Sequence, residues 1–349
     1  MIINLLDYTL EELAEITKLS PSYRVKQLFH GLQTGQKPSE ISVLPLSVRN
    51  ELSQFAVGVD IIEQFKSVDG SEKYLFKLSD GNIIEGVFMP HSYGNTLCVS
   101  TQVGCRMGCA FCASGIGGLV RNLSAGEILG QVLSVNRLKN GGMGEKRQIT
   151  NIVLMGSGEP LDNYVNVTKF FRLVSSPDGI NVSLRNVSLS TCGLVENIRR
   201  LADEGFGVTL SISLHATTDE TRQELMPIAR KYTISDIIDA VKYYFDKTGR
   251  RIIFEYSMVK GKNINYFDAV RLGKITKGYP SHVNLIMLNP VKEKKLDACT
   301  QGDAQRFLDR LKENNVSATI RRSFGNDISG ACGQLRRSHL NNDNNNKRS

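Results

Sequence analysis

The stretch Cys98–Gly115 reads CVSTQVGCRMGCAFCASG and holds four of the chain's seven cysteines. Three of these, Cys105, Cys109 and Cys112, have the spacing C-x3-C-x2-C, and Cys98 lies a short way upstream. An odd number of cysteines argues against a framework in which every thiol is paired in a disulfide. Clustered thiols of this kind indicate a metal site or a catalytic thiol.

Zinc and iron make different demands on such a cluster. A structural zinc site takes four protein ligands, commonly from two separated C-x2-C pairs, and this chain has no second pair. Three thiolates suit a cubane iron–sulfur cluster in which one iron stays open to a ligand that is not protein. The spacing therefore favours a 4Fe–4S cluster held by Cys105, Cys109 and Cys112.

Downstream of this stretch the sequence alternates between short β-branched runs and helical patterns. The runs are TLCVSTQ, TNIVLMG, RNVSLSTCG, VTLSISLH, RIIFEYSMV, HVNLIML and VSATIRR, and the helical patterns cover 124–137, 165–174, 195–204, 219–225, 234–247, 266–276 and 302–314. Such alternation predicts a parallel sheet with right-handed crossovers. Six or seven such units predict an α/β fold, either an incomplete (β/α)6-type barrel or an open doubly wound sheet.

The first 92 residues have a different pattern. TLEELAEI carries a capping box, with Thr9 as N-cap and Glu12 three residues on, and two more helical patterns follow it. The runs VDIIEQFKSV, EKYLFKL and NIIEGVFM are separated by DGS and SDG turns and predict a small antiparallel sheet. We therefore expect a separate helical and β-hairpin module over 1–92, the α/β domain over 93–337, and a disordered polar tail over 338–349.

Charge and hydropathy limit the class of protein. Lys and Arg number 43 against 35 Asp and Glu, and the pI is about 9.1, which fits a polyanionic partner. Basic pairs such as Arg321-Arg322 are each expected to be solvated surface charge. No run of 18 or more apolar residues is present, so we expect no membrane-spanning helix. The N-terminus carries Asp7 and Glu11 where a signal peptide needs a basic start, so we expect a cytoplasmic protein.

The cysteine pattern and its place in the fold resemble a known superfamily. C-x3-C-x2-C directly after the first parallel strand, with Phe111 before the last thiol, resembles the signature of the radical S-adenosylmethionine superfamily. The resemblance implies a 4Fe–4S cluster with S-adenosylmethionine bound at its open iron. It also implies that MGSGEP, which is similar to the superfamily's GGE segment, receives the aminoacyl end of S-adenosylmethionine through Gly158 and Glu159.

Small polar residues follow several of the predicted strands. One such residue alone is most often a cap or a turn former. Because the carboxyl ends of parallel strands meet on one rim, several together favour contacts with a ligand. We expect cofactor contacts from Gly158, Glu159, Ser190, Ser213, Leu214, His215 and Asn289.

Cys332 lies beyond the last predicted strand, in GNDISGACGQLRR. Gly330, Ala331 and Gly333 flank it, and a loop of small residues exposes a thiol rather than burying it. A loop that folds back over the strand ends would make Cys332 a candidate nucleophile. Cys98, taken alone, is expected to be a buried strand cysteine.

The chain resembles the RlmN and Cfr family of RNA methyltransferases in six segments: TLCVSTQVGCRMGCAFCASG, RNLSAGEILGQV, MGSGEPLDN, LSISLHATTDETRQELMPI, TIRRSFGNDI and ACGQL. The match covers nearly all of residues 80–337, and YRVKQLFHGL resembles the family's N-terminal RNA-binding module. Four positions depart from the expected pattern without removing a thiol or a ligand position: Ser157, Cys192, Ala229 and Gly330.

This family resemblance implies a reaction sequence. Cys332 takes a methyl group from one S-adenosylmethionine, and a second molecule is cleaved reductively to a 5′-deoxyadenosyl radical that removes hydrogen from the methylated cysteine. The resulting carbon radical adds to carbon-2 of an adenine, and Glu85 takes the ring proton. Cys98 then attacks the adduct and leaves a Cys98–Cys332 disulfide. Chemistry of this difficulty is delegated to the cofactor, while the protein positions the reactants.

The resemblance also implies partners. The substrates would be 23S rRNA near the peptidyl-transferase centre and tRNA beside the anticodon, with residues 1–92 as an RNA-binding module. The reaction would need a one-electron reductant such as flavodoxin or ferredoxin. We expect the chain to act as a monomer.

Two alternatives stay open at this point. A Cfr-type enzyme that methylates carbon-8 uses the same thiols, and QVGC at 102–105 favours carbon-2 because Cfr-type sequences tend to carry another cysteine there. From a different class, the chain could be a zinc-bearing RNA-binding protein without catalysis, which the missing second C-x2-C pair disfavours. Cys192 and Cys299 have no assigned role.

Overall fold

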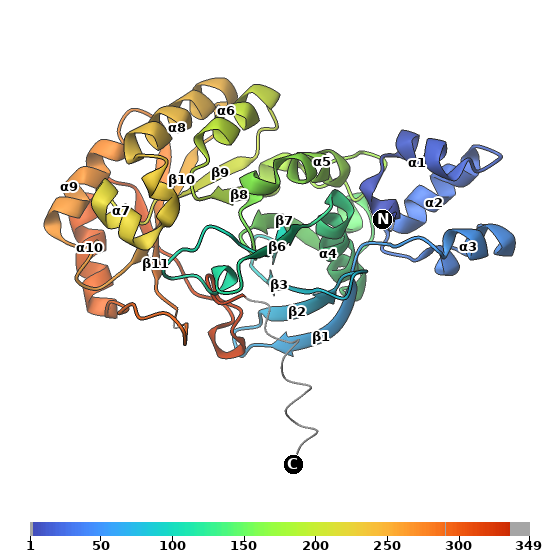
Figure 1. The fold of residues 1–349 in the computed structure, drawn as a ribbon, viewed down its shortest axis with the longest axis horizontal. Coiled ribbons are helices and arrows are strands. Elements are labelled where there is room, and N and C mark those ends of the chain that lie inside the picture. The colour runs from blue at the N-terminus through green and yellow to red at the C-terminus, as the bar shows by residue number, and fades with distance from the viewer. Residues whose placement is uncertain (1–2, 290, 336–349) are drawn as a thin grey trace, which may run out of the picture.

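The computed structural model describes residues 3–289 and 291–335 of the chain. Within this part, ten strands form one sheet in the order β1-β2-β3-β4-β7-β8-β9-β10-β11-β12. Along this order, neighbouring strands pair antiparallel from β1 to β4 and in parallel from β4 onward to β12. The edge strands β1 and β12 do not pair with each other, so the curved sheet stays open (Figure 1). The predicted incomplete α/β barrel is confirmed.

Seven of the strands are the β-branched runs that the sequence predicted downstream of residue 95. The bounds are β1 Asp60–Lys66, β2 Glu72–Lys77, β3 Ile83–Met89, β4 Asn95–Cys98, β7 Ile149–Leu154, β8 Val187–Thr191, β9 Thr209–Ser213, β10 Ile252–Met258, β11 Ser281–Met287 and β12 Ala318–Ile320. A separate two-stranded antiparallel ladder, β5 Gln102–Gly104 with β6 Leu119–Asn122, was not predicted. Strands of three and four residues are too short to show an alternating pattern.

The predicted helices are present, and their ends fall where capping residues place them. Their bounds are α1 Leu10–Thr17, α2 Tyr23–Gln33, α3 Leu46–Leu52, α4 Ala125–Leu138, α5 Tyr164–Val174, α6 Val195–Glu204, α7 Asp219–Leu225, α8 Ile234–Thr248, α9 Tyr266–Ile275 and α10 Gln301–Glu313. The capping boxes of α1 and α4 form as predicted, from Thr9 with Glu12 and from Ser124 with Glu127. Helices cover the outer face of the curved sheet, and the main apolar core lies between these helices and the strands (Figure 1).

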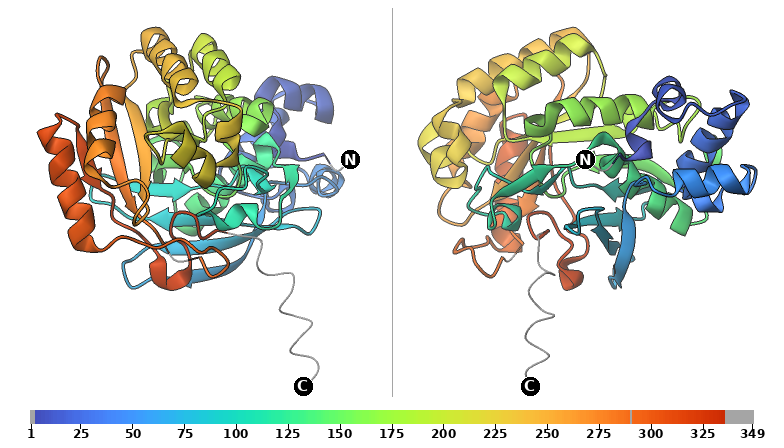
Figure 2. Two further views of the ribbon diagram at one scale, coloured as in Figure 1. Left: turned by 60° about the vertical axis from the view of Figure 1, so that its left-hand side comes forward. Right: turned by 45° about the vertical axis from the view of Figure 1, so that its right-hand side comes forward.

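The N-terminal helices form a lobe at one end of the molecule and dock on α4 (Figures 1 and 2). Asp7 caps α4, because its carboxylate accepts a hydrogen bond from the Gly126 amide at 2.6 Å. A Cβ on Gly130 would lie 2.6 Å from Gly58, so the two backbones touch only because both residues are glycine. An ion pair between Glu12 and Lys169 of α5, at 3.0 Å, adds a polar tie.

The predicted domain boundary near residue 92 does not interrupt the sheet. Strands β3 and β4 pair antiparallel across it, with Val87 opposite Cys98 and Met89 opposite Thr96. Without this pairing the first parallel strand would present an open edge, and an unpaired edge is a liability in any sheet. The β-hairpin part of the N-terminal module is therefore built into the α/β sheet, and only the helices stand apart as a lobe.

Two further predictions concern the C-terminal tail and membrane-spanning helices. The predicted disordered tail, 338–349, lies outside the described residues. Among the described helices, none combines the length and the apolar character that a membrane crossing requires.

Candidate active site

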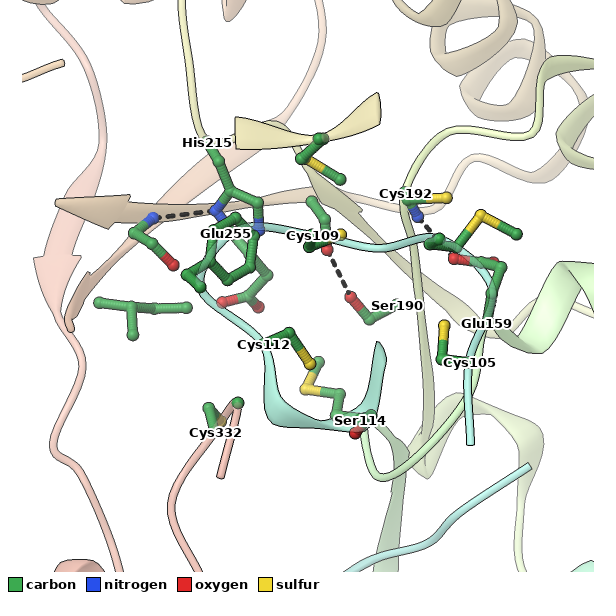
Figure 3. Close-up of a pocket in the computed structure, with 18 of the residues that line it drawn as sticks. Cys105, Cys109, Cys112, Ser114, Glu159, Ser190, Cys192, His215, Glu255 and Cys332 are labelled. Atoms are coloured by element: carbon green, nitrogen blue, oxygen red, sulfur yellow. Dashed lines mark hydrogen bonds between the residues drawn. The ribbon is translucent and has the colours of Figure 1, made fainter. Parts of the chain in front are cut away.

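The carboxyl ends of β7 to β11 face one cavity of about 160 Å³, which is partly open to solvent. The loop after β5 and the C-terminal segment after β12 form its other walls (Figure 3). Carboxyl ends of parallel strands are where α/β proteins bind ligands. The structure brings ten of the predicted site residues to this cavity: Cys105, Cys109, Cys112, Gly158, Glu159, Ser190, Ser213, His215, Asn289 and Cys332.

The loop that carries the three cysteines is fixed at three points. The β5–β6 ladder closes its base, where the Cys105 amide donates to the carbonyl of Gly118, the residue before β6, at 3.1 Å. The Ala110 amide donates to the carbonyl of Leu225 at the end of α7, at 2.8 Å. The Ala113 amide donates to the carbonyl of Gly333 in the C-terminal segment, at 2.7 Å. The loop therefore reaches the cavity as an ordered part of the fold.

The three thiols fit iron–sulfur coordination better than a single ion. Among the residues that the structure describes, no three His, Cys, Asp or Glu side chains converge as the ligands of one ion would. Cysteines of a cubane each bind a different iron, so they surround a volume rather than a point. Burial raises the pKa of Cys105 to about 12 and also raises that of Cys109, so both thiols need a nearby cation in order to ionise.

The two glycines of MGSGEP, after β7, are needed for packing against the chain itself. A Cβ on Gly156 would lie 2.7 Å from the Val99 carbonyl, and one on Gly158 would lie 2.7 Å from Gln102. Gly158 also has a φ of +110°, which favours glycine. The structure shows a close approach to Val99 and to Gln102 of β5, and both glycines also line the cavity, so the predicted approach to a ligand stays a prediction.

Glu159 has a fixed orientation at the wall of the cavity. Its carboxylate accepts hydrogen bonds from the Cys192 amide at 2.8 Å and from the Leu161 amide at 3.0 Å. Burial raises the pKa of Glu159, and the amide bonds oppose that shift. The side chains of Thr191 and Cys192 also donate to this carboxylate and oppose the shift, so Glu159 is held from several sides.

His215 and Phe111 form one corner of the cavity. His215 has a φ of +55°, and its Nδ1 accepts a hydrogen bond from the Ser257 amide at 2.9 Å, which leaves the ring proton on Nε2. Burial, with a smaller effect of Arg222, lowers the pKa of His215 to about 3, so the ring is neutral at physiological pH. The Phe111 ring packs edge-on against it at 4.6 Å between centroids.

Leu214 is the predicted cofactor contact that does not reach the cavity. Its side chain is fully buried in the main hydrophobic core. Ser213 and His215 line the cavity, whereas the Leu214 side chain points away from it into the core, which leaves only the Leu214 backbone for a contact with a cofactor.

Arg222 on α7 is a site residue that the sequence did not reveal. It is fully buried, its Nη2 donates to the Cys192 carbonyl at 2.7 Å, and its Nε donates to the Leu214 carbonyl at 3.2 Å. Its Nη1 has no acceptor among the described residues. Burial lowers the pKa of Arg222, and the nearby thiols of Cys192 and Cys109 oppose this. A buried donor without a partner beside a ligand cysteine fits an acceptor that arrives with the cofactors.

Arg321 and Glu255 form a second group that was not predicted. Both line the cavity, and their side chains approach to 3.5 Å between Arg321 Nη1 and Glu255 Oε2. Asn284 donates to the other carboxylate oxygen at 3.0 Å. The expectation that Arg321 is solvated surface charge is wrong, because β12 ends at Ile320 and directs the next residue inward. In the sequence, a basic pair after a strand looks the same whether its side chains face solvent or a cavity.

Cys98 and Cys332 border a second, much smaller cavity of about 30 Å³. Cys98 is buried at the end of β4, whereas Cys332 is exposed, and both are free thiols. Burial, followed by the negative charge of Cys332, raises the pKa of Cys98 to about 12, and Arg321 opposes the shift. The predicted pair therefore shares one cavity. Cys332 also lines the larger cavity, so it lies between the three-cysteine loop and Cys98.

Glu85 lies on β3 and is buried, but it does not line either of these cavities. Val87 pairs with Cys98 in the antiparallel register, and Glu85 is two residues from Val87, so Glu85 and Cys98 share one face of the sheet. Its carboxylate lies 3.8 Å from Lys73 Nζ.

The segment with Cys332 is tied to the β1–β2 turn by a group that we call the hairpin clamp, formed by Ser67, Asp69, Gly325 and Asp327. Asp69 accepts from the Gly325 amide at 2.9 Å, and Asp327 accepts from the Ser67 hydroxyl at 2.6 Å. Asn289 adds a tie within the cavity, because its amide donates to the Cys332 carbonyl at 3.0 Å. The sequence predicted Asn289 as a cofactor contact, and its observed partners are the Cys332 carbonyl and the Ser323 hydroxyl.

An open α/β sheet whose strand ends face a C-x3-C-x2-C loop defines a class of enzyme. The Radical SAM superfamily model matches residues 99–272, and the chain has the superfamily's 4Fe–4S cluster and S-adenosylmethionine as its cofactors. The solved structure of a radical SAM methyltransferase from Sphaerobacter thermophilus has a TM-score of 0.91 and 39% identity to this chain, and the match covers 96% of this chain and 99% of that one.

Two sequence relatives narrow the class. The "Probable dual-specificity RNA methyltransferase RlmN" of Clostridium perfringens strain 13 is 51% identical over 97% of both chains. A relative of the same name from Clostridium botulinum strain Alaska E43 is 49% identical, again over 97% of both chains. The chain therefore belongs to the RlmN family of dual-specificity RNA methyltransferases.

Proposed function

We propose that the chain methylates carbon-2 of an adenosine in 23S rRNA and in tRNA, through a methylated Cys332. Family membership supports the reaction class. The single observation that carries the mechanism is the position of Cys332, which borders both the cavity with the three-cysteine loop and the cavity with Cys98. A thiol that takes a methyl group from a donor and passes the carbon to a substrate must be able to contact the donor and the substrate in turn.

The cofactors supply an electrophilic methyl group and, on one-electron reduction, a carbon radical able to remove hydrogen from a methyl group. Cys105, Cys109 and Cys112 would hold the cluster. Gly158, Glu159, Ser190, Ser213, His215 and Asn289 line the cavity in which S-adenosylmethionine would bind. Glu159 and the neutral His215 then offer an acceptor and a donor of fixed orientation.

The chain's own residues carry the remaining steps. The Cys332 sulfur forms a bond to the methyl carbon as the sulfonium bond of the donor breaks, and the thiol proton leaves to solvent. After the carbon has joined the adenine ring, Glu85 accepts the proton from carbon-2, and the unpaired electron of the adduct returns to the one-electron carrier that supplied it. Cys98 attacks the Cys332 sulfur, and the bond between that sulfur and the transferred carbon breaks. The carbon takes up the proton that the Cys98 thiol gives up, which makes it a methyl group, and a Cys98–Cys332 disulfide remains. Two electrons from a cellular thiol or reductase return both cysteines to the thiol state.

Partners follow from the same proposal. Residues 1–92 contact RNA, and the surplus of 43 basic over 35 acidic residues supports a polyanionic substrate. The one-electron reductant is flavodoxin or ferredoxin. The chain acts as a monomer in the cytoplasm, where both RNAs occur.

The test is a reconstitution without oxygen. The protein should show a 4Fe–4S spectrum, the Cys332 peptide should gain a methyl group from labelled S-adenosylmethionine, and digested RNA should contain 2-methyladenosine. Recovery of 8-methyladenosine instead would support the Cfr-type alternative, which family membership disfavours. Bound zinc without iron or sulfide would support the non-catalytic alternative and refute the proposal.

A further inference from the structure

Four side chains from two distant segments form a stack at the surface, which we call the aromatic platform: His91, Tyr93, Arg322 and Phe324. The rings of His91 and Tyr93 are stacked, with centroids 4.8 Å apart and planes 8° from parallel. Phe324 packs edge-on against His91 at 5.1 Å, and the Arg322 guanidinium lies 5.1 Å above the Phe324 ring. His91 and Tyr93 come from the loop between β3 and β4, whereas Arg322 and Phe324 follow β12.

The platform leads from the second cavity to solvent. Phe324 packs against the apolar cluster that contains Cys98 and Met89, and it lines the cavity together with Arg322 and Cys332. At the other end of the stack Tyr93 is 75% exposed. The stack therefore begins beside the thiol pair and ends in water.

The platform is also held in place before any ligand binds. The residue after Phe324, Gly325, has a φ of +65° and donates its amide to Asp69 in the hairpin clamp. Single exposed apolar residues on a surface need no explanation. Tyr93 differs because its ring is already oriented, with one face on His91 and the other side open to solvent.

Burial, followed by the charges of Arg321 and Arg322, lowers the pKa of His91, so its ring is neutral at physiological pH. The platform thus combines uncharged aromatic faces with an arginine at its side. Proteins that recognise unpaired nucleotides use this combination, since a base stacks on an aromatic face and a guanidinium meets phosphate or stacks in turn.

We propose that the aromatic platform binds the substrate RNA by stacking an unpaired base that neighbours the target adenosine on Tyr93, with Arg322 facing the phosphate between them. The inference rests on the proposed function and adds to it the place where RNA enters. Chemistry on a ring carbon requires the target base to leave its stack, which exposes its neighbours. Those neighbours need new stacking partners, and the platform offers one beside the cavity of Cys98 and Cys332.

The experiment uses the full chain and an RNA hairpin with 2-aminopurine beside the target adenosine. Stacking on Tyr93 should quench the 2-aminopurine fluorescence on binding. Tyr93→Ala should remove the quenching and weaken binding and kcat/KM for RNA about tenfold. Tyr93→Phe should retain both, because it keeps the ring, and Arg322→Gln should weaken binding more at low salt than at high salt.

A matched control is Tyr266→Ala, which removes another exposed tyrosine, 55% exposed and packed edge-on against Phe267 on α9. It should change neither binding nor quenching. Methylation of Cys332 by S-adenosylmethionine without RNA should be the same in all these variants. Loss of that methylation in the unchanged protein would contradict the proposed function, not the platform.

Two results would overturn the platform. One is unchanged quenching, RNA affinity and kcat/KM in both Tyr93→Ala and Arg322→Gln. The other is unchanged RNA binding in Tyr93→Ala together with slower turnover that a chemical reductant restores, which would assign this surface to the protein reductant. The 2-aminopurine fluorescence with the unchanged protein tests the platform even if a variant misfolds, because a lack of quenching on binding would exclude stacking on Tyr93.

Discussion

The two sides of the active site are built in different ways. The cofactor side lies at the ends of parallel strands, and its polar groups, Glu159, His215 and Arg222, are buried and bonded to backbone. The thiol side consists of Cys98 on a strand and Cys332 on an irregular segment that the hairpin clamp fastens through carboxylates near the surface.

This difference matches what each side has to do. A side that keeps its ligand through a radical reaction benefits from groups that do not reorient, since preorganised dipoles need no rearrangement during the reaction. In the proposed function the Cys332 sulfur meets a methyl donor, an adenine base and a second thiol in turn, so it must change its bonding partner. Segments held by few buried apolar contacts open more readily than strands. The comparison therefore predicts that substitutions on the thiol side change individual steps and leave the cluster intact.

The largest effect is expected for Cys332→Ala. The variant has no sulfur to accept the methyl group, so all RNA methylation should stop, while iron content and reductive cleavage of S-adenosylmethionine persist. Cys109→Ala is the matched change on the cofactor side and should remove both. Anaerobic iron analysis and nucleoside mass spectrometry measure the two outcomes, and methylated RNA from Cys332→Ala would contradict the role of this thiol.

Cys98→Ala should stop the reaction one step later. Without the attacking thiol the bond between Cys332 and the methylated base persists, so a covalent protein–RNA adduct should accumulate to about one per protein. Denaturing gel electrophoresis with labelled RNA detects it. Multiple turnovers by this variant would show that Cys98 does not resolve the adduct.

Arg321→Gln should slow the same step without abolishing it. Burial, followed by the charge of Cys332, raises the pKa of Cys98 to about 12, and the Arg321 charge opposes the shift together with a backbone hydrogen bond at Met155. Its removal should raise that pKa further, so the thiolate fraction at a given pH falls about tenfold for each unit. The pH profile of adduct resolution in single-turnover experiments should move to higher pH. Arg321→Lys keeps the charge and should move it less, and identical profiles in all three proteins would exclude this role.

Arg222→Gln tests the cofactor side. A buried positive charge near Cys109 stabilises the reduced, more negative cluster, so its loss should make the midpoint potential more negative. We expect a shift of about 59 mV, a tenfold change in the reduced fraction for one electron. EPR-monitored titration measures the shift, and Arg222→Lys should show less of it. A full iron complement at an unchanged potential in Arg222→Gln would leave Arg222 with a packing role only.

The sequence predicted the parts of this site that have a local pattern. Strand ends, capping boxes and the three-cysteine spacing are read within a few residues, so Ser190, Ser213 and His215 were placed correctly at the cavity. Arg222 and Arg321 were not found, because a charged residue on a short helix or after a strand indicates solvent exposure until tertiary packing decides otherwise.

The hairpin clamp could not be predicted from the sequence either, because it joins segments about 250 positions apart that only the tertiary fold brings together. Leu214 was assigned to the cavity because the sequence gives the end of a strand but not the face that each residue takes. The pairing of Cys98 with Cys332 came from family resemblance, and the fold supplies its physical basis, one cavity that both thiols border.

The smallest effect is expected at the hairpin clamp, as a dependence on pH. Burial alone would raise the pKa of Asp69, but hydrogen bonds from Ser71, the Gly325 amide and Ser67 outweigh it and lower the pKa from 3.8 to about 2. Because the folded value is the lower one, the clamp contributes fully above about pH 4 and is lost as the pH falls through about 2. Asp69→Asn mimics the protonated state at every pH.

The variant should therefore loosen the segment that carries the already exposed Cys332, so this thiol should be labelled a few times faster than in the unchanged chain at pH 7, and the difference should shrink as the pH approaches 2. The measurement is the labelling rate of Cys332 in protein without cofactors, by a pyridyl disulfide that reacts at acid pH, relative to a free peptide with the same thiol. Cys105 labelling serves as the internal control, because the β5–β6 ladder and the Leu225 carbonyl still hold its loop when the tie from Ala113 to Gly333 loosens. Equal acceleration at both cysteines would mean that the whole cavity loosens, and the distinction between a fixed cofactor side and a fastened thiol side would then fail.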